Sequence, residues 1–422
     1  MRVLPMSETL SSLPTQWLTL IGLGEDGPAG LTEETRQRIA SAPIVYGGAR
    51  HLELVAPLIG GETHSWLSPF ERSIDHLLAR RGMPTVVLAS GDPFWFGIGA
   101  TLSRFIPPEE MYVIPAPSAF SLAAARLGWP MQSATLLSLH GRPIDLLRPH
   151  LHPGRKIIAL TSDATSPEAI AALLTRLGFG RSTLTLMEAM GGARERVTLH
   201  KAASFSLEDI DALNVMAVEV VADRDARLLP LAQGLDDALF SHDGQITKRE
   251  IRAMTLSALA PRHGDLLWDI GAGSGSVSIE WLLADPSLRA IAIEAVRDRA
   301  ARIRRNADDF GVPMLQLVEG TAPEALTGLA QPDAIFIGGG GSEPGVMEAA
   351  KAALKPGGRL VANGVTTEME AVLLAEYARH GGSLTRIDIA RVTPIGTMHG
   401  WRTAMPVMQW CWTKPETTEI AQ

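Results

Sequence analysis

Two glycine-rich loops constrain the fold of this chain more than any other feature. The first, GLGEDG at residues 22–27, follows the apolar run 17–21, and the second, GAGSGS at residues 271–276, follows the apolar run 266–270. Glycine permits positive φ angles and lets the backbone come close to a ligand. Because the two loops differ in pattern, they predict two unlike α/β domains, each with its own small-molecule site.

The charge balance argues against nucleic acid as a partner. The 422 residues, enough for two or three domains, include 38 Lys and Arg against 46 Asp and Glu, a net charge of −8. Proteins that bind a phosphate backbone are usually basic. The arginines between residues 297 and 305 lie on a predicted helix, where a solvated face is the simplest interpretation.

Cysteine content and hydropathy predict a cytoplasmic protein. Cys411 is the single cysteine, so no internal disulfide can form, which suits a reducing compartment. Residues 1–16 lack the apolar segment of a signal peptide, and we expect a disordered leader there, with Met6 as an alternative start. No apolar run reaches the roughly 18 residues of a membrane span, so no membrane is expected.

The first half alternates strand-like and helix-like segments, which predicts a parallel α/β fold. The rhythm restarts near residue 135, so we expect one unit of two α/β lobes over residues 17–230, with a loop at 191–196. The predicted strands are 17–21, 44–46, 85–89, 111–114, 135–139, 156–161, 183–188 and 215–221, and the predicted helices are 32–41 and 167–178.

After a predicted junction at 229–243, the second half indicates a doubly wound domain over residues 236–422. Thr247 and Glu250 have the spacing of a capping box. The predicted strands are 266–270, 290–294, 315–319, 334–337 and 359–363, with a final strand pair at 386–392 and 407–413. The predicted helices are 247–259, 277–283, one ending at residue 310, and 345–354.

The second glycine loop has the features of an S-adenosylmethionine site. A helix starts directly after Gly271, Gly273 and Gly275, so its amide groups face the ligand. Asp269 stands where it can attract the ammonium of the cofactor, and Glu294 lies near the spacing of roughly 20 residues for an acid that binds ribose. A nicotinamide dinucleotide is the alternative, but it needs glycine where Ser276 stands. Glu294 could instead only cap the next helix.

Two further loops complete this predicted site. Thr321 and Ala322 follow the third strand, where an adenine ring would pack, and Thr247 is expected to face the cofactor. Gly339 and Gly340 leave room for a broad, flat substrate, although a plain flexible turn is the alternative. The Asn-Pro-Pro-Tyr motif of many base methylating enzymes is absent, which lowers a DNA methyltransferase interpretation.

The first glycine loop matches a dinucleotide fingerprint, but the next strand ends in Gly47 and Gly48, without an acid for ribose. The motifs SGDPFWFG at 90–97, PAPSA at 115–119 and LHGR at 139–142 resemble those of the tetrapyrrole methylase family over residues 17–225. Members of this family hold S-adenosylmethionine in a cleft between two α/β lobes. The resemblance implies a substrate role for Gly22 and Gly24 and a cofactor role for Gly91, Asp92, Phe94, Ser118, Ala119, Thr161 and Gly191. Asp92 could instead be only a turn residue.

The segment DGQITKREIR at 243–252, followed by residues 269–280, resembles the small decarboxylating corrin methyltransferases. In this order the two halves resemble the family of fused corrin C5,15-methyltransferases. The resemblance implies that precorrin-6B becomes precorrin-8X. The second domain would remove the ring C acetate carboxyl and methylate carbon 15, and the first would methylate carbon 5.

A substrate with many carboxylates needs cationic anchors. We nominate Lys248, His399 and Arg402 in the second domain, with His399 as a candidate proton-transfer group. In the first domain we nominate His140 and Arg142. A surface salt bridge is the alternative for each. We also expect a homo-oligomer and no metal.

Two other functions remain open at this point. One is an RNA or protein methyltransferase fused to a diphthine-synthase-like domain. This function keeps both cofactor sites and differs only in the molecule that accepts the methyl group. The other is a noncatalytic sensor of the cofactor or of a tetrapyrrole. Both glycine loops lack inserted bulk or charge, which disfavours the sensor.

Overall fold

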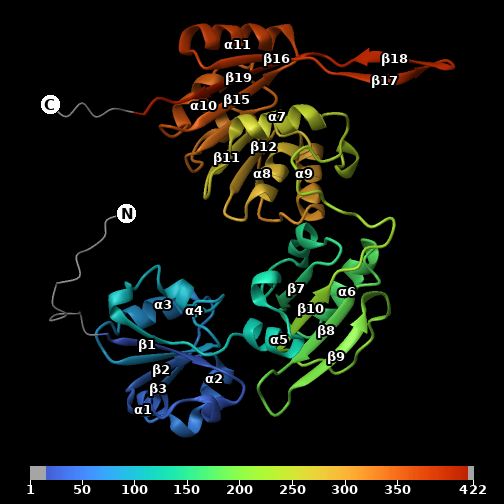
Figure 1. The fold of residues 1–422 in the computed structure, drawn as a ribbon. Helices are drawn as coiled ribbons and strands as arrows, with labels where there is room; N and C mark the ends of the chain where they lie inside the picture. Colours follow the sequence, from blue (N-terminus) through green and yellow to red (C-terminus); the bar gives the residue numbers. More distant parts are fainter. Residues whose placement is uncertain (1–15, 417–422) are drawn as a thin grey trace, which may run out of the picture. The chain divides into compact units, whose positions relative to one another are not determined.

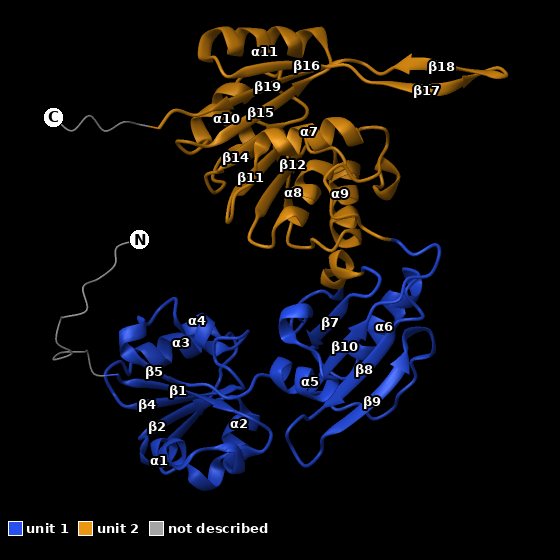
Figure 2. Cartoon of the chain, in the orientation of Figure 1, with its two compact units in different colours: residues 1–144, 152–227 blue, residues 145–151, 228–422 orange. Residues whose placement is uncertain are grey.

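The computed structural model describes residues 16–416 and divides into two compact units (Figure 2). Unit 1 comprises residues up to 144 together with 152–227, and unit 2 comprises 145–151 together with the residues from 228 onward. The sequence does not predict that residues 145–151 belong to unit 2, whereas the residues before and after them belong to unit 1. The leader expected at 1–16 lies, apart from its last residue, outside the described residues.

The first lobe of unit 1 is an all-parallel sheet in the order β3-β2-β4-β1-β5. Helices α1 and α2 pack on one face of it, and α3 and α4 on the other, so its inner strands are apolar on both sides, whereas the edge strand β3 is polar. Its elements are β1 Leu18–Leu23, α1 Glu33–Ser41, β2 Ile44–Gly47, α2 Ala49–Leu54, β3 Glu62–Ser65, α3 Glu71–Leu78, β4 Thr85–Ser90, α4 Ile98–Leu102 and β5 Met111–Ile114 (Figure 1).

The second lobe differs from the prediction, because its sheet is mixed. The order is β6-β7-β10-β8-β9, and only β6 and β7 are parallel. The edge strand β9 was missed although polar and apolar residues alternate at its start, and it takes Arg196 from the predicted loop. The elements are α5 Ala119–Leu127, β6 Thr135–Ser138, β7 Lys156–Leu160, α6 Ser166–Arg176, β8 Thr183–Glu188, β9 Arg196–Lys201 and β10 Asn214–Glu219.

Unit 2 contains a seven-stranded sheet in the order β13-β12-β11-β14-β15-β19-β16. Helices α7, α8 and α9 cover one face and α10 and α11 the other. The elements are α7 Arg249–Leu259, β11 Leu266–Ile270, α8 Ser276–Ala284, β12 Arg289–Glu294, α9 Arg297–Asp309, β13 Gln316–Glu319, β14 Ala334–Ile337, α10 Val346–Ala353, β15 Arg359–Gly364, α11 Thr367–His380, β16 Ser383–Ile387 and β19 Val407–Thr413.

The C-terminal strand prediction is wrong in part. β19 pairs with β16, whereas β17 Ala390–Ile395 and β18 Met398–Thr403 form a separate hairpin. In Figure 1 this hairpin extends away from the sheet of unit 2. The predicted strand 386–392 therefore spans the end of one strand and the start of another. Helix α11, which begins after its N-cap Thr366, was not predicted.

Two local predictions around the start of unit 2 also need correction. Helix α7 has Lys248 as its N-cap, without a side-chain cap, so the capping box at Thr247 is wrong. Glu250 pairs instead with Arg391 of β17. The predicted junction at 229–243 is no free linker, since Leu235 and Phe240 are buried in the core of unit 2.

Candidate functional site

The glycine loop of unit 2 lies between β11 and α8, and its backbone requires glycine. Gly271, Gly273 and Gly275 have φ angles of 69°, 60° and 75°, which side chains rarely adopt. A Cβ on Gly271 would lie 2.6 Å from the carbonyl oxygen of Gly339. The loop after β11 and the loop after β14 are therefore in contact, as expected at the carboxyl edge of a parallel sheet.

Asp269, near the end of β11, has an unusual environment. Its side chain is 1 % exposed, and Oδ2 accepts hydrogen bonds from the Ser278 amide (3.1 Å) and hydroxyl (2.6 Å). Oδ1 is buried without a hydrogen-bond partner. Burial raises the pKa of this carboxyl to about 6, and the charge of Glu294 acts in the same direction. A buried acceptor without a donor needs an explanation, and a cationic ligand would supply the donor.

Glu294, at the end of β12, holds the glycine loop in place. One carboxylate oxygen accepts from the amide of Gly273 (2.8 Å) and the other from the amide of Val296 (2.9 Å), the N-cap of α9. The helix-capping alternative for Glu294 is therefore present in the structure, alongside a contact with the loop. Its predicted contact with ribose stays a prediction.

The remaining predicted cofactor and substrate residues of unit 2 follow strands at the same sheet edge. Thr321 and Ala322 follow β13, where the Thr321 carbonyl accepts from the amide of Ala325 (3.0 Å). Gly339 and Gly340 follow β14, and Gly340 has a φ angle of 71°. The structure thus gathers the predicted loops, but their ligand contacts stay predictions.

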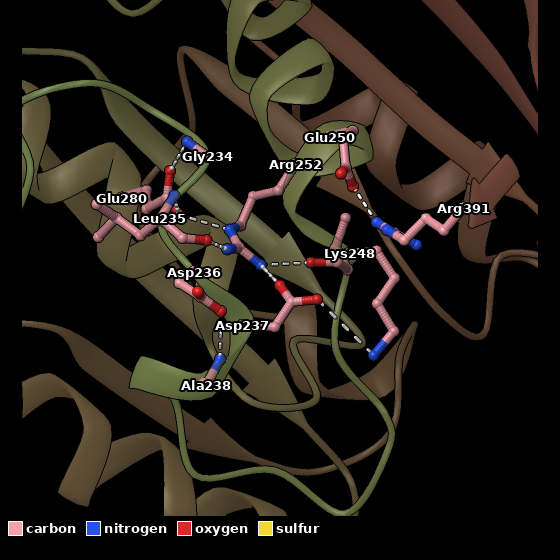
Figure 3. Close-up of polar contacts among 11 residues, drawn as sticks. Gly234, Leu235, Asp236, Asp237, Ala238, Lys248, Glu250, Arg252, Glu280 and Arg391 are labelled. Atoms are coloured by element: carbon pink, nitrogen blue, oxygen red, sulfur yellow. Dashed lines mark hydrogen bonds and ion pairs between the residues drawn. The ribbon is translucent and has the colours of Figure 1, made fainter. Parts of the chain in front are cut away.

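Lys248 belongs to a polar network around the buried Arg252 (Figure 3). The Arg252 guanidinium donates to Glu280 (2.5 Å) and Asp237 (3.0 Å), and also to the carbonyls of Thr247 and Leu235. The ammonium of Lys248 is 3.8 Å from Asp237. The predicted anchor Lys248 therefore already has an anionic neighbour, and its side chain is 48 % exposed.

Arg252 and Glu280 were missed by the sequence prediction. Glu280 also accepts from the amides of Gly234 (2.6 Å) and Leu235 (2.9 Å), so the pair fastens the entry segment of unit 2 to helices α7 and α8. A charged residue on the inward face of each predicted helix was the available signal. This network positions Thr247 and Lys248 at the start of α7.

His399 and Arg402 lie on β18, within the hairpin and not between the last strands of the sheet. Both side chains are exposed. Arg402 pairs across the hairpin with Arg391, and Arg391 is held by Glu250 in the first turn of α7. This places Arg402 near the Lys248 end of α7, whereas His399 lies farther toward the hairpin tip.

In unit 1, three loops meet at the carboxyl edge of the first sheet. A Cβ on Gly22 would lie 1.9 Å from the Gly91 carbonyl oxygen, and one on Gly91 would lie 2.8 Å from the Cα of Ser118. The carboxyl end of β1 and the loops after β4 and β5 are therefore packed backbone to backbone. Next to Gly22, a Cβ on Gly24 would meet the Asp26 carboxylate at 2.6 Å.

The predicted cofactor residues of this edge have local structural roles as well. Asp92 Oδ1 accepts from the amide of Phe94 (2.9 Å), so the turn alternative for Asp92 is present in the structure. Ser118 caps α5 by accepting from Ser121 (3.2 Å), and Ala119 is the first residue of that helix.

The second lobe contributes the other predicted positions of unit 1. The buried Thr161 hydroxyl donates to the carbonyl oxygen of Asn214 (2.7 Å), and the Thr161 carbonyl lies 3.2 Å from Nδ1 of His140. Gly191, with a φ angle of 85°, donates to Glu195 (2.7 Å). Arg142 is exposed. No ligand contact of these residues is defined, so their binding roles stay predictions.

A cluster of charged side chains at the same edge was missed. Arg50 forms an ion pair with Glu25 of the first glycine loop and donates to the Ser90 hydroxyl (3.0 Å). Nε2 of His51 is 2.8 Å from that hydroxyl. Burial, with a smaller effect of Arg50, lowers the pKa of His51 to about 4. Arg194 of the second lobe lies 3.9 Å from Glu25. A signal was available, because Arg50 and His51 come shortly after the predicted strand 44–46, at the start of α2.

The described part of the chain contains neither a candidate metal cluster nor a candidate membrane-spanning helix. Within residues 16–416, no group of three or more His, Cys, Asp or Glu side chains could hold a metal ion. Among the helices of the same residues, none combines the length and the apolar character that crossing a bilayer requires.

Comparison with known families divides the chain in the same order. Residues 17–205 match the model of the Tetrapyrrole (Corrin/Porphyrin) Methylases. Residues 238–414 match the model of a Precorrin methyltransferase domain.

One curated relative spans almost the whole chain. It is named Precorrin-6Y C(5,15)-methyltransferase [decarboxylating], from Sinorhizobium sp, and is 65 % identical over 97 % of this chain and 99 % of its own length. Two shorter relatives come from Salmonella typhimurium. A Cobalt-precorrin-7 C(5)-methyltransferase is 32 % identical over 43 % of this chain and 88 % of its own length. A Cobalt-precorrin-6B C(15)-methyltransferase (decarboxylating) is 35 % identical over 41 % of this chain and 92 % of its own length.

Proposed function

The chain belongs to the family of decarboxylating precorrin-6Y C(5,15)-methyltransferases, and on that premise we propose how its two units divide the reaction. Unit 2 removes the ring C acetate carboxyl of precorrin-6B and methylates carbon 15. Unit 1 then methylates carbon 5, which gives precorrin-8X. Each unit holds its own molecule of S-adenosylmethionine.

The observation that carries the cofactor proposal is the unpaired buried oxygen of Asp269. S-adenosylmethionine has an ammonium group, which would donate the missing hydrogen bond, and a sulfonium whose methyl group is already electrophilic. The glycine loop of residues 271–275 lets its backbone approach the cofactor, and Glu294 is the proposed ribose partner. Thr247, Thr321 and Ala322 complete the proposed cofactor pocket of unit 2.

The proposed cofactor site of unit 1 lies at the edge where the carboxyl end of β1 and the loops after β4 and β5 are packed together. Gly91, Asp92, Phe94, Ser118, Ala119, Thr161 and Gly191 are its proposed lining. Gly22 and Gly24 are proposed to face the tetrapyrrole, with His140 and Arg142 as anchors for its carboxylates. The close packing of Gly22 on Gly91 would set the distance between substrate and cofactor.

For the methyl transfer, the main task of the protein is to orient the tetrapyrrole and S-adenosylmethionine relative to each other. An aligned, electron-rich meso carbon can take the methyl group without a protein nucleophile. Exclusion of water would favour loss of the carboxylate as carbon dioxide, because the macrocycle can delocalise the remaining charge. Lys248 and Arg402 are proposed carboxylate anchors beside Gly339 and Gly340, and His399 is the proposed proton-transfer group.

Cellular setting is part of the same proposal. The single cysteine, Cys411, is partly buried and unpaired, which suits a reducing cytoplasm. We also propose a homo-oligomer, because the hairpin exposes large apolar side chains such as Trp401 and Met398. The precorrin is the proposed partner, and the acidic net charge leaves no reason to propose nucleic acid.

Product analysis of two full-length variants tests this division. Asp269→Asn should slow carbon 15 methylation when precorrin-6B is supplied with a limiting concentration of S-adenosylmethionine, because it weakens the proposed cofactor site of unit 2. Gly91→Val should leave carbon dioxide release intact and accumulate the decarboxylated, once-methylated intermediate. If Gly91→Val abolishes carbon dioxide release, or Asp269→Asn methylates carbon 15 at the wild-type rate under these conditions, the assignment of steps to units is wrong. The same family membership disfavours an RNA or protein acceptor.

A further inference from the structure

The loop between β4 and α4 presents three consecutive aromatic side chains to solvent. Phe94, Trp95 and Phe96 are 43 %, 45 % and 50 % exposed. Contiguous exposed apolar side chains mark binding surfaces more often than isolated ones do. The family resemblance gives a role to Phe94 alone, so the exposure of Trp95 and Phe96 has no explanation in the proposed cofactor pocket.

The backbone of this loop is built to hold the rings outward. Phe96 has a φ angle of +55°, which costs conformational energy for a bulky residue and persists only where the surroundings impose it. The turn is fastened at Asp92, whose carbonyl accepts from the amide of Trp95 (3.1 Å). A Cβ on Gly97 would lie 2.6 Å from the Pro93 carbonyl oxygen, so the loop is wound tightly on itself.

The two rings also lie beside the proposed cofactor pocket of unit 1. The ring centroids of Trp95 and Phe96 are 6.3 Å and 5.8 Å from that of Phe120, and 6.0 Å from each other. Phe120 is buried in α5, two residues after Ser118, whose backbone is packed against Gly91. The exposed rings of one lobe therefore rest on the core of the other lobe at the start of α5.

We propose that Trp95 and Phe96 form an aromatic platform that binds one flat face of the tetrapyrrole in unit 1 and holds carbon 5 beside the cofactor. This proposal rests on the proposed function of unit 1. Partly conjugated pyrrole rings offer a broad apolar face to aromatic side chains, and the rim of the macrocycle is anionic.

Charge around the loop supports this occupant over an apolar peptide. Arg50, which also forms an ion pair with Glu25, donates to the hydroxyl of Ser90 (3.0 Å), the residue directly before Gly91, so a guanidinium paired with a carboxylate stands at the start of the same loop. A flat apolar surface with a cation near its border matches a macrocycle whose carboxylates lie at its rim. Trp95 and Phe96 act as substrate-binding residues, because they contact the macrocycle and the methyl transfer itself needs no group from them.

The experiment uses the full-length enzyme with precorrin-6B and methyl-labelled S-adenosylmethionine. Trp95→Ala and Phe96→Gly should each raise the KM of the carbon 5 methylation by about tenfold, which corresponds to about 1.4 kcal/mol. The kcat of that step should change by less than about twofold, since the rings bind substrate and transition state alike. Carbon dioxide release and carbon 15 methylation in unit 2 serve as internal controls and should not change.

Three matched measurements separate binding from folding. Trp95→Phe should restore most of the lost affinity. Phe96→Gly relieves the strained φ angle but loses the contact with Phe120, so the two effects oppose each other and its Tm should stay close to that of the wild type. Phe105→Ala removes a ring of the same exposure, 49 %, from the end of α4, and should leave all three steps unchanged.

Several outcomes would overturn the platform. One is an unchanged KM for carbon 5 methylation in both variants. The rings would then either bind another protein or serve only in packing. Another is a weakened Kd for S-adenosylhomocysteine with an unchanged precorrin KM, which would make the rings a wall of the cofactor pocket. A wild-type enzyme that never methylates carbon 5 would refute the proposed function of unit 1 and the platform with it.

Discussion

Replacing Asp269 by Asn should strengthen the fold of unit 2 while it weakens cofactor binding there. A pKa raised from 3.8 to about 6 corresponds to a penalty of about 3 kcal/mol for holding the buried carboxylate ionised. The pKa of this carboxyl is higher in the folded than in the unfolded state. Below pH 3.8 the carboxyl is protonated in both states, and the penalty for burying its charge is absent. The stability that comes from this absence is lost as the pH rises through about 6, so the full penalty acts at pH 8.

The amide of Asn removes this charge but is not free of cost. Its oxygen can still accept from Ser278, while its NH₂ group takes the place of the unpaired Oδ1 and lacks an acceptor, a loss of about 1–3 kcal/mol. We therefore expect Asp269→Asn to be between equally stable and about 2 kcal/mol more stable than the wild type at pH 8. Its advantage should vanish near pH 4, where the wild-type carboxyl is protonated.

Cofactor affinity should move in the opposite direction. Loss of a charge-assisted hydrogen bond to the ammonium costs about 1.5–3 kcal/mol, which is about a 10- to 100-fold higher Kd for S-adenosylhomocysteine at unit 2. Scanning calorimetry at pH 4 and pH 8, with and without S-adenosylhomocysteine, measures both effects on the intact chain.

Asp333→Asn is the matched control for this prediction. Asp333 precedes β14 in the same sheet and is paired with Lys355 (2.7 Å), which, with the amide of Leu266, lowers its pKa despite burial. Asp333→Asn should destabilise unit 2 and leave cofactor affinity unchanged. A lower stability of Asp269→Asn at pH 8, or an unchanged Kd, would refute the reasoning and make Asp269 a purely structural acid.

Two further predictions concern other residues of unit 2. His399→Ala should slow carbon dioxide release but spare cofactor binding, because an exposed side chain of the hairpin supports no core contact, and unchanged turnover would remove His399 from the mechanism. Arg252→Met should lower the unfolding free energy of unit 2 by about 3–5 kcal/mol, because it leaves Glu280 buried and unpaired, and chemical denaturation measures the loss.

Each of these variants has a neighbour as its control. Thr393→Ala changes the same hairpin as His399→Ala without removing a titratable group and should keep full activity. Arg249→Met removes an exposed arginine one turn before Arg252 and should cost less than about 0.5 kcal/mol. A loss below about 1 kcal/mol for Arg252→Met would show that the buried pair is dispensable for stability.

Sequence reasoning succeeded where the signal is local. The glycines of residues 271–275 predict positive φ angles, because glycine is the residue that adopts them readily. β11 and β14 were predicted with the bounds that the structure has, since continuous apolar runs are typical of buried parallel strands. The place of Asp269 near the end of a strand was predicted correctly, whereas its contact with the cofactor ammonium stays a prediction. Its missing hydrogen-bond partner was not predicted, because burial depends on the whole domain.

The failures share a dependence on distant residues. β9 is an edge strand without a buried residue, so no apolar core face marks it. The hairpin of β17 and β18 could not be told from the strand pair β16 and β19 without knowing the core. Arg252 meets Glu280 between two helices far apart in the sequence, and Arg50 meets Ser90 across two strands. Contacts of this kind are set by packing, so the local pattern can mark a charged residue but does not identify its partner.

The central claim is that each unit binds its own molecule of S-adenosylmethionine. Isothermal titration of the full-length wild-type protein with S-adenosylhomocysteine measures this directly. Two equivalents per chain, with one lost in Asp269→Asn and the other in Gly91→Val, is the expected result. A single equivalent per wild-type chain would contradict the account.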